Sequence, residues 1–406
     1  RASRGLDRLM VALRRHGLAD GVSDASVLAD LIALRRAYLD PAGAPGAGAG
    51  APRGFWPGTG EIARTEDLEK LARFAAFATA AYGALLVSAL TRRGRGVAWS
   101  LLQNFRSPRQ ADLQAIAQHC GLPSEDIVHY QEGGGGAFRP SWFLAWDARS
   151  GEAVLSVRGT ASVDEALTDC VCEAAAFEEG VAHRGFLESA RALHQQVQGP
   201  LEQLGERKQV KRLVVCGHSL GGACAALLAV ALRREQRAGR GPMPGAEIEC
   251  LTYGCPPVAA IREDAVTGLP KLLNVAYRFD WVPRAQLGNV LRLVRAVADV
   301  EALRLPMRRR LFGEPAFQFD QVYGQPLDAP GASAAPLRLL GRCVWLYDAC
   351  AGLHVQGEVA DVARLCDAPP VLEDPVRAVL DHLPNQYETA LQRALACARG
   401  AGPAGT

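Results

Sequence analysis

The sequence predicts an α/β fold with a mostly parallel central sheet, helices on both of its faces and a helical appendage at the N-terminus. The short apolar run Leu213 to Cys216 leads through a turn into the Ala- and Leu-rich stretch Ala223 to Leu232, which indicates buried strand, turn and helix. Three more runs have the composition of strands: Ala153 to Val157, Ile248 to Tyr253 and Leu272 to Tyr277. At 406 residues and 49% hydrophobic content, the chain can bury a large core.

The turn between the first strand and its helix carries a chemical signature. Gly217-His218-Ser219-Leu220-Gly221 has the pattern G-x-S-x-G, which is typical of a nucleophile elbow in α/β-hydrolases. An elbow holds its serine in a strained backbone conformation, and the two glycines leave room for strand and helix to pack. We therefore expect Ser219 to be a nucleophile and the N–H of Leu220 to face the oxyanion that forms beside it. The alternative is a Gly-rich turn whose serine only caps the helix.

Composition divides the chain into three parts. Residues 1–40 are expected to form a helical appendage, and residues 41–55, rich in Gly, Pro and Ala, a linker that cannot pack. Residues 56–400 are then the main domain, with an inserted excursion at about 288–335. The boundary is expected near residue 55.

Charge and cysteine content narrow the classes of function. A net charge of +2 gives no electrostatic argument for binding nucleic acid, and the eleven cysteines do not form the paired C-x-x-C motifs of a zinc site. Scattered cysteines favour a reducing, intracellular compartment, with the protein cytoplasmic or attached to the periphery of a membrane. The chain begins with Arg1, so an upstream segment, including a membrane segment, stays open.

One uncharged stretch raises the question of a membrane span. Phe74 to Leu90 carries no charged residue and is about as long as the shortest spans. Because alanine contributes little to membrane insertion, its Ala-rich composition favours a buried helix of the main domain.

A nucleophilic serine needs a base and an acid, which follow it in α/β-hydrolases in the order serine, acid, histidine. Asp280 lies three residues beyond Tyr277, past the carboxyl end of a predicted strand, where functional residues of a parallel sheet collect. Asp264 lies in a predicted helix and is the weaker candidate for the acid. Only His354 and His382 follow Asp280. We favour His382 as the base because it precedes the final predicted helix, the usual place for it.

The oxyanion needs a second donor besides the N–H of Leu220. Arg158-Gly159-Thr160 directly follows a predicted strand, in the position from which this fold supplies that donor. We expect the N–H of Thr160 to fill this role, while an ordinary turn is the alternative.

Taken together, these residues resemble the class 3 lipase family. The resemblance covers about residues 65 to 397, and it rests on a series of motifs in a shared order: GHSLGG at Ser219, Arg158-Gly159-Thr160, His183-x-Gly185-Phe186, Asp280 with Val282-Pro283-Arg284, and Asp381-His382 with Tyr387. Within the family, Ser156 to Thr160 with Ala166 to Asp169 is similar to the sn-1-specific diacylglycerol lipases. The resemblance implies a lipase-type α/β-hydrolase fold with Ser219 as nucleophile, Asp280 as acid and His382 as base.

The implied function is that of a serine-dependent lipase. It would cleave a fatty acyl ester of a glycerolipid, most simply the sn-1 ester of diacylglycerol, through an acyl-serine intermediate and without metal or organic cofactor. Its partners would be the lipid substrate and a lipid–water interface or membrane surface; the sequence does not indicate an oligomeric state. Phospholipase A1 and galactolipase are alternatives, because their headgroup pockets cannot be recognised from one sequence. A lipase-like scaffold without activity is an alternative of another class, although it would not need to keep all three residues.

The excursion between acid and base adds a further expectation. It combines an apolar stretch, Val290 to Val300, with the basic triplet Arg308 to Arg310. In the family such an insert covers the active site, so we expect part of residues 288–335 to lie over Ser219 as a lid. The basic triplet would favour anionic surfaces.

Overall fold

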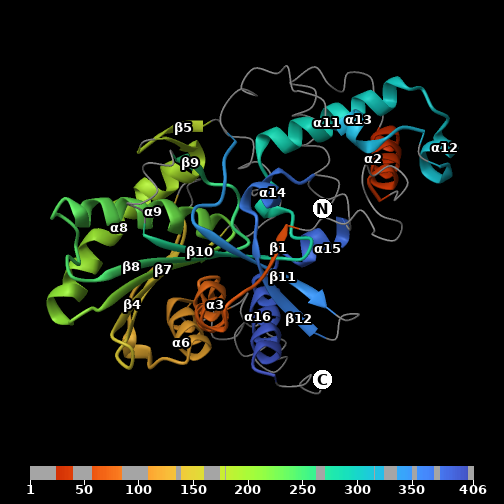
Figure 1. Ribbon diagram of the computed structural model, residues 1–406. Helices are drawn as coiled ribbons and strands as arrows, with labels where there is room; N and C mark the ends of the chain where they lie inside the picture. The colour runs from red at the N-terminus through yellow and green to blue at the C-terminus, as the bar shows by residue number, and fades with distance from the viewer. Residues whose placement is uncertain are drawn as a thin grey trace.

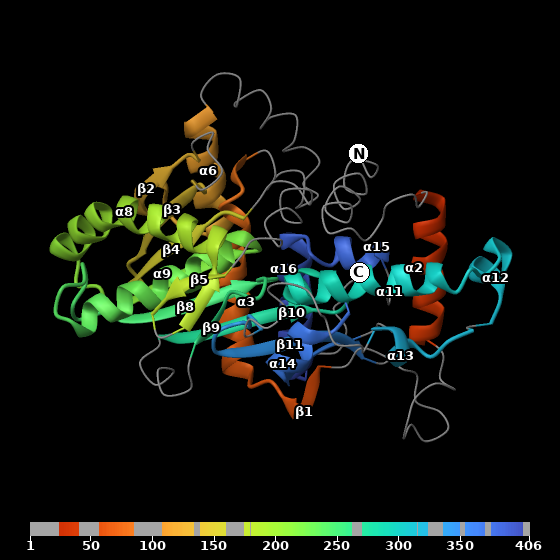
Figure 2. The same cartoon turned by 90° about the horizontal axis from the view of Figure 1, so that it is seen from above.

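The computed structural model describes most of the chain (Figures 1 and 2). The described residues are 24–39, 57–84, 108–133, 139–159, 174–178, 180–261, 270–314, 316–323, 336–349, 354–369 and 375–400. Our predictions for residues 1–23, for the linker, for Thr160 and for Asp264 lie outside these ranges.

A nine-stranded sheet forms the centre of the described structure, in the order β1-β12-β11-β10-β8-β7-β4-β3-β2. Its five middle strands run parallel to one another: β4 (Glu152–Val157), β7 (Arg212–His218), β8 (Glu247–Tyr253), β10 (Lys271–Tyr277) and β11 (Arg342–Ala349). The flanking strands are antiparallel: β1 (Gly58–Ile62), β12 (His354–Ala360), β3 (Trp142–Asp147) and β2 (Ile127–Gln131). The sequences of the middle strands are nearly continuous apolar runs, as expected for strands that are buried on both faces of a sheet.

Helices cover both faces of this sheet (Figure 1). On one face α8 (Arg184–Arg207) and α9 (Leu220–Arg237) pack into one apolar core. On the other face α3 (Thr65–Ala80), α6 (Pro108–Cys120) and α16 (Pro384–Ala398) share a second core. The predicted fold class, an α/β-hydrolase fold with a mostly parallel sheet, is thereby confirmed.

Smaller elements complete the described structure. A three-stranded sheet joins β5 (Ala174–Phe177), β6 (Gly180–His183) and β9 (Ala259–Ile261). Short helices lie at η2 (Ser124–Asp126), η3 (Val282–Arg284), α14 (Val362–Asp367) and α15 (Pro375–Leu380).

The uncharged stretch at residues 74–90 begins inside α3. Phe74 and Phe77 are buried against the sheet, as the buried-helix interpretation expects, and residues 85–90 lie outside the described ranges. Across the part of the chain that the structure describes, no helix is both long and apolar enough to cross a bilayer.

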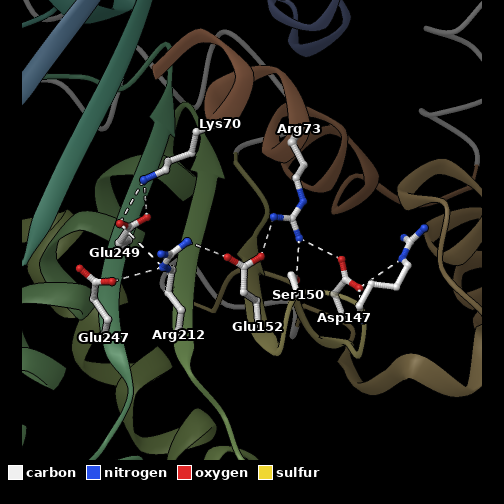
Figure 3. A network of polar contacts seen from close by, with 9 residues as sticks. Lys70, Arg73, Asp147, Ser150, Glu152, Arg212, Glu247 and Glu249 are labelled. Carbon is white, nitrogen blue, oxygen red and sulfur yellow. Dashed lines mark hydrogen bonds and ion pairs between the residues drawn. The ribbon is translucent and has the colours of Figure 1, made fainter. Parts of the chain in front are cut away.

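A network of ion pairs fastens α3 to the amino ends of the strands (Figure 3). From α3, the Arg73 guanidinium lies 2.6 Å from a carboxylate oxygen of Glu152, and the Lys70 ammonium lies 2.9 Å from Glu249. Arg212 pairs with the other oxygen of Glu152 at 2.8 Å. Because both glutamates are almost fully buried, these cations are needed to offset the cost of burying the carboxylates. The network lies at the amino ends of the parallel strands, whereas β7 leads into α9 at its carboxyl end. It therefore stabilises the fold from the end of the sheet opposite Ser219.

The excursion and the N-terminal appendage pack on each other. Three helices of the excursion, α11 (Leu287–Ala302), α12 (Met307–Phe312) and α13 (Phe319–Tyr323), surround α2 (Asp24–Leu39) beside the main domain (Figures 1 and 2). Leu34 and Ala37 of α2 share an apolar cluster with Ala296, Val300 and Phe319. We call this group of four helices the satellite. This contact was not predicted from the sequence. The domain boundaries and the lid over Ser219 remain predictions.

A buried ion cluster ties α2 to the excursion. The Arg310 guanidinium lies 2.8 Å from Asp30 and 2.5 Å from Glu301, and Asp30 is fully buried. Burial raises the pKa of Asp30 to about 6, against the opposing effect of its bond to Arg310. The last arginine of the basic triplet thus has a structural role inside the satellite.

Candidate active site

Ser219 lies at a sharp turn where β7 ends and α9 begins. Its backbone has φ 59° and ψ −131°, a combination that costs a non-glycine residue free energy and is typical of functional sites. The turn is held in place because the Ser219 N–H donates to the Tyr253 carbonyl of β8 at 2.9 Å. The predicted strand, turn and helix are therefore all present.

Two glycines of the motif leave the space that the turn needs. A Cβ on Gly217 would lie 2.4 Å from the Gly221 backbone, and one on Gly221 would lie 2.2 Å from the Val157 carbonyl oxygen. Neither distance is compatible with a side chain. The glycines thus allow α9 to start directly against β7 and β4.

The structure brings Ser219, His382 and Asp280 into one hydrogen-bonded row. The His382 Nε2 lies 2.9 Å from Ser219 Oγ, and its Nδ1 lies 2.9 Å and 3.1 Å from the two carboxylate oxygens of Asp280. Since a carboxylate can only accept, Nδ1 carries a proton, and in this tautomer Nε2 is the nitrogen that can accept from the serine hydroxyl. Ser219 and Asp280 are each about 2% exposed, so these bonds operate in a largely water-free environment.

Asp280 is held by two further donors. The Val282 N–H donates to one of its carboxylate oxygens at 2.9 Å, and the Tyr387 hydroxyl donates to the other at 2.5 Å. Burial, and then the neighbouring Asp280 charge, raise the pKa of Tyr387, so that its hydroxyl keeps its proton and remains a donor. These bonds fix the orientation of the carboxylate toward His382.

The oxyanion side of the site is only partly within the described residues. Leu220 is the first residue of α9, so backbone N–H groups of the first helical turn point back toward Ser219. Gly159 follows β4 and passes so close that a Cβ placed on it would lie 3.1 Å from Ser219 Cβ. Thr160 comes next in the chain but is outside the described residues, and its role as the second donor remains a prediction.

His218 and Tyr82 form a second hydrogen-bonded row beside His382. The His218 Nε2 lies 2.6 Å from the backbone carbonyl oxygen of His382, and its Nδ1 lies 2.8 Å from the Tyr82 hydroxyl. A carbonyl can only accept, so Nε2 donates and Nδ1 accepts from Tyr82. Burial, and then the adjacent His382, hold the pKa of His218 well below its ordinary value, which keeps the ring neutral.

The sequence did not reveal the role of His218, although that residue stands inside the motif. Tyr82 lies in the uncharged stretch 74–90, where the sequence did not indicate that its hydroxyl bonds to the motif histidine. The rival base His354 opens β12, a strand near the edge of the sheet, and His382 is the histidine that reaches Ser219.

The fold and this row of side chains define the class of the protein: an α/β-hydrolase with a serine elbow. Residues 154–289 match the family described as Lipase (class 3). The chain is 26% identical over 258 residues to diacylglycerol lipase-beta of Mus musculus, covering 58% of this chain and 36% of that protein. It is 28% identical over 203 residues to diacylglycerol lipase-alpha of Homo sapiens, covering 46% of this chain and 18% of that protein. The resemblance to class 3 lipases, and among them to diacylglycerol lipases, is thus confirmed, while the chain spans well under half the length of these relatives.

Solved lipase structures are similar at a lower level. A lipase from Rhizopus microsporus var. chinensis superposes with a TM-score of 0.49 at 17% identity, covering 80% of this chain and 88% of that one. Lipase II from Rhizopus niveus gives a TM-score of 0.49 at 16% identity, covering 80% of this chain and 95% of that one.

Proposed function

We propose that this protein is a serine hydrolase that cleaves a fatty acyl ester of a glycerolipid. The observation that carries the proposal is the row Ser219, His382, Asp280: a buried carboxylate orients the imidazole, whose other nitrogen lies 2.9 Å from the hydroxyl of a serine with a strained backbone. This is the arrangement that activates a serine for acyl transfer.

In the first half of the reaction, Ser219 Oγ attacks the ester carbonyl while His382 Nε2 takes its proton. The negative charge on the tetrahedral oxygen is stabilised by backbone N–H groups at the start of α9, with the Leu220 N–H closest in the chain and Thr160 as the second expected donor. His382 then gives the proton to the leaving glycerol oxygen, which leaves an acyl-serine. Asp280 stabilises the positive charge that the imidazole carries between these two steps.

In the second half, water attacks the acyl-serine. His382 takes a proton from this water and returns it to Ser219 Oγ when the tetrahedral intermediate collapses, releasing the fatty acid. The residues need no metal or organic cofactor for either half.

For the substrate, we propose the sn-1 ester of diacylglycerol at a lipid surface. The proposal is supported by the diacylglycerol lipases among the relatives of this chain. Phospholipase A1 and galactolipase activity remain alternatives, because they use the same catalytic row and differ in the headgroup. An inactive lipase-like scaffold is the alternative of another class.

The test begins with the nucleophile and the base. A fluorophosphonate probe should label the wild-type protein and not the Ser219→Ala variant, whose ester hydrolysis should fall below about one per cent of wild type. His382→Ala should lower turnover by roughly 10⁴-fold or more, whereas His354→Ala is the matched control and should stay active. Labelling of Ser219→Ala, or loss of activity in His354→Ala alone, would contradict the assignment.

The second step compares substrates with purified wild-type protein. Diacylglycerols acylated with distinguishable chains at sn-1 and sn-2 should release the sn-1 chain faster. If phosphatidylcholine or galactolipid is cleaved faster than diacylglycerol, the substrate proposal is wrong while the serine mechanism stands. If none is cleaved and the probe does not react, the scaffold alternative is supported.

A further inference from the structure

The end of the excursion exposes large apolar side chains. Seven such residues are exposed in the part of the chain that the structure describes, and three of them fall within the ten residues 303–312. Leu303 is 48% exposed, Met307 40% and Phe312 76%. We call residues 303–312, which join the end of α11 to α12, the tip. Apolar side chains concentrated in one short exposed segment indicate a contact surface rather than chance exposure.

The same ten residues carry only positive charge. Arg304, Arg308 and Arg309 are exposed, none of them forms an ion pair with another described residue, and the tip contains no Asp or Glu. Arg310, in contrast, turns inward to Asp30 and Glu301. The basic triplet is thus divided: two arginines face outward with Arg304, and the third fastens the tip to the satellite.

The satellite presents the tip at one end of the molecule. Both views show α12 at the end opposite α8 (Figures 1 and 2). The contacts behind it are firm, because the Arg310 cluster and the Arg36 bond to the Leu311 carbonyl connect α12 to α2. A supported tip loses less conformational freedom on docking than a loose loop would.

We propose that the tip docks the protein on an anionic lipid surface, with Phe312, Met307 and Leu303 entering the headgroup region and the arginines facing the lipid phosphates. Interleaved apolar and basic side chains are what an interfacial segment requires. An acidic protein would also attract the arginines. The choice of a lipid surface rests on the proposed function, whose substrate lies in such a surface.

The experiment measures how the Ser219→Ala variant of the whole 406-residue chain, which is not expected to consume the lipid, binds to vesicles. Vesicles of phosphatidylcholine alone are compared with vesicles that also contain phosphatidylserine, at low and at high salt, by co-sedimentation. We expect clear binding to the anionic vesicles, weakened by salt. Replacing Arg304, Arg308 and Arg309 by Gln should weaken it by roughly 100-fold at low salt, since each arginine near an anionic surface contributes a factor of about five. Phe312→Ser should weaken it by about tenfold.

Two control variants match these changes elsewhere on the surface. A triple Arg→Gln variant at the opposite end of the molecule removes the same charge from exposed positions at the last residues of α8 and α9 and three residues beyond α9: Arg207, Arg237 and Arg240. Ile62→Ser removes an apolar side chain that is 60% exposed on the edge strand β1. Neither control should weaken vesicle binding by more than about twofold. The melting temperature of every variant is measured to check that the variant is folded.

The outcomes separate the docking proposal from the proposed function. Equal weakening by the two triple variants would show an effect of net charge alone and overturn the proposal. Absence of binding to anionic vesicles would also overturn it, whatever fluorophosphonate labelling of the wild type shows. Tighter binding to soluble polyglutamate than to vesicles, lost in the tip variants, would identify an acidic protein as the partner and overturn the lipid surface.

Discussion

His218 is expected to act as a positioning residue for His382, the proposed base, and replacing it tests this expectation. Its ring bridges the buried Tyr82 hydroxyl and the partly buried His382 backbone carbonyl. In His218→Leu, a side chain of similar size with no polar atoms, the His382 carbonyl loses this donor and the Tyr82 hydroxyl loses this acceptor. A buried polar group without a partner costs about 1–3 kcal/mol. The segment that carries His382 can avoid this cost only by moving its carbonyl toward another donor.

Such a movement shifts the base away from Ser219 Oγ. A displacement of the base by about 1 Å can lower turnover by about 100-fold, so we expect His218→Leu to reduce kcat by roughly 10–100-fold while KM for a small soluble ester changes little. His218→Gln can still place an N–H near the carbonyl and should recover much of the loss. The assay is kcat and KM with a soluble short-chain ester, expressed per active site by fluorophosphonate titration.

A matched control separates positioning from general loosening. The His119 ring lies 2.9 Å from Glu388 of α16, so His119→Leu also removes a histidine that bonds to the C-terminal segment, but not one that holds the carbonyl of the base. This control should lower stability without the fall in kcat. Wild-type kcat in His218→Leu, or a fall that His218→Gln does not reverse, would refute the reasoning.

Two predictions concern stability. Burial raises the pKa of Asp30 from 3.8 to about 6, so between these pH values the folded protein keeps a proton that the unfolded chain has lost, and the free energy of unfolding falls as the pH rises. In thermal denaturation the wild type should therefore lose stability relative to Asp30→Asn across this pH range. A stability difference that stays constant over the range would contradict this. Arg73→Met removes a cation shared by the buried carboxylates Asp147 and Glu152, and because the Arg73 side chain is 39% exposed we expect a loss of about 1–2 kcal/mol in urea denaturation, with an unchanged rate of fluorophosphonate labelling. A labelling rate that falls with stability would mean that the network also shapes the site.

The elements that carry the site could be predicted because their signals are local. A strand buried on both faces is a continuous apolar run, and the turn after it must be rich in glycine because a Cβ on Gly217 or Gly221 would collide with backbone. Asp280 was predicted from the rule that functional side chains follow parallel strands, and His382 from its place before the final helix. Each of these arguments needs only a few neighbouring residues and a general property of the fold.

What could not be predicted depends on contacts between distant segments. Nothing in residues 24–39 shows that they pack on an excursion more than 250 residues later, because an apolar helix face has the same pattern whatever covers it. The inward orientation of Arg310, with Arg308 and Arg309 exposed, follows from that packing. In the sequence alone, the three arginines are indistinguishable members of one basic cluster. His218 is the same case at the site: the motif places it beside Ser219, but only the folded chain brings the carbonyl of His382 to its ring. The residues that perform the proposed chemistry can therefore be recognised from their neighbours in the sequence. The residues that hold His382 and support the tip can be recognised only from contacts in the tertiary structure.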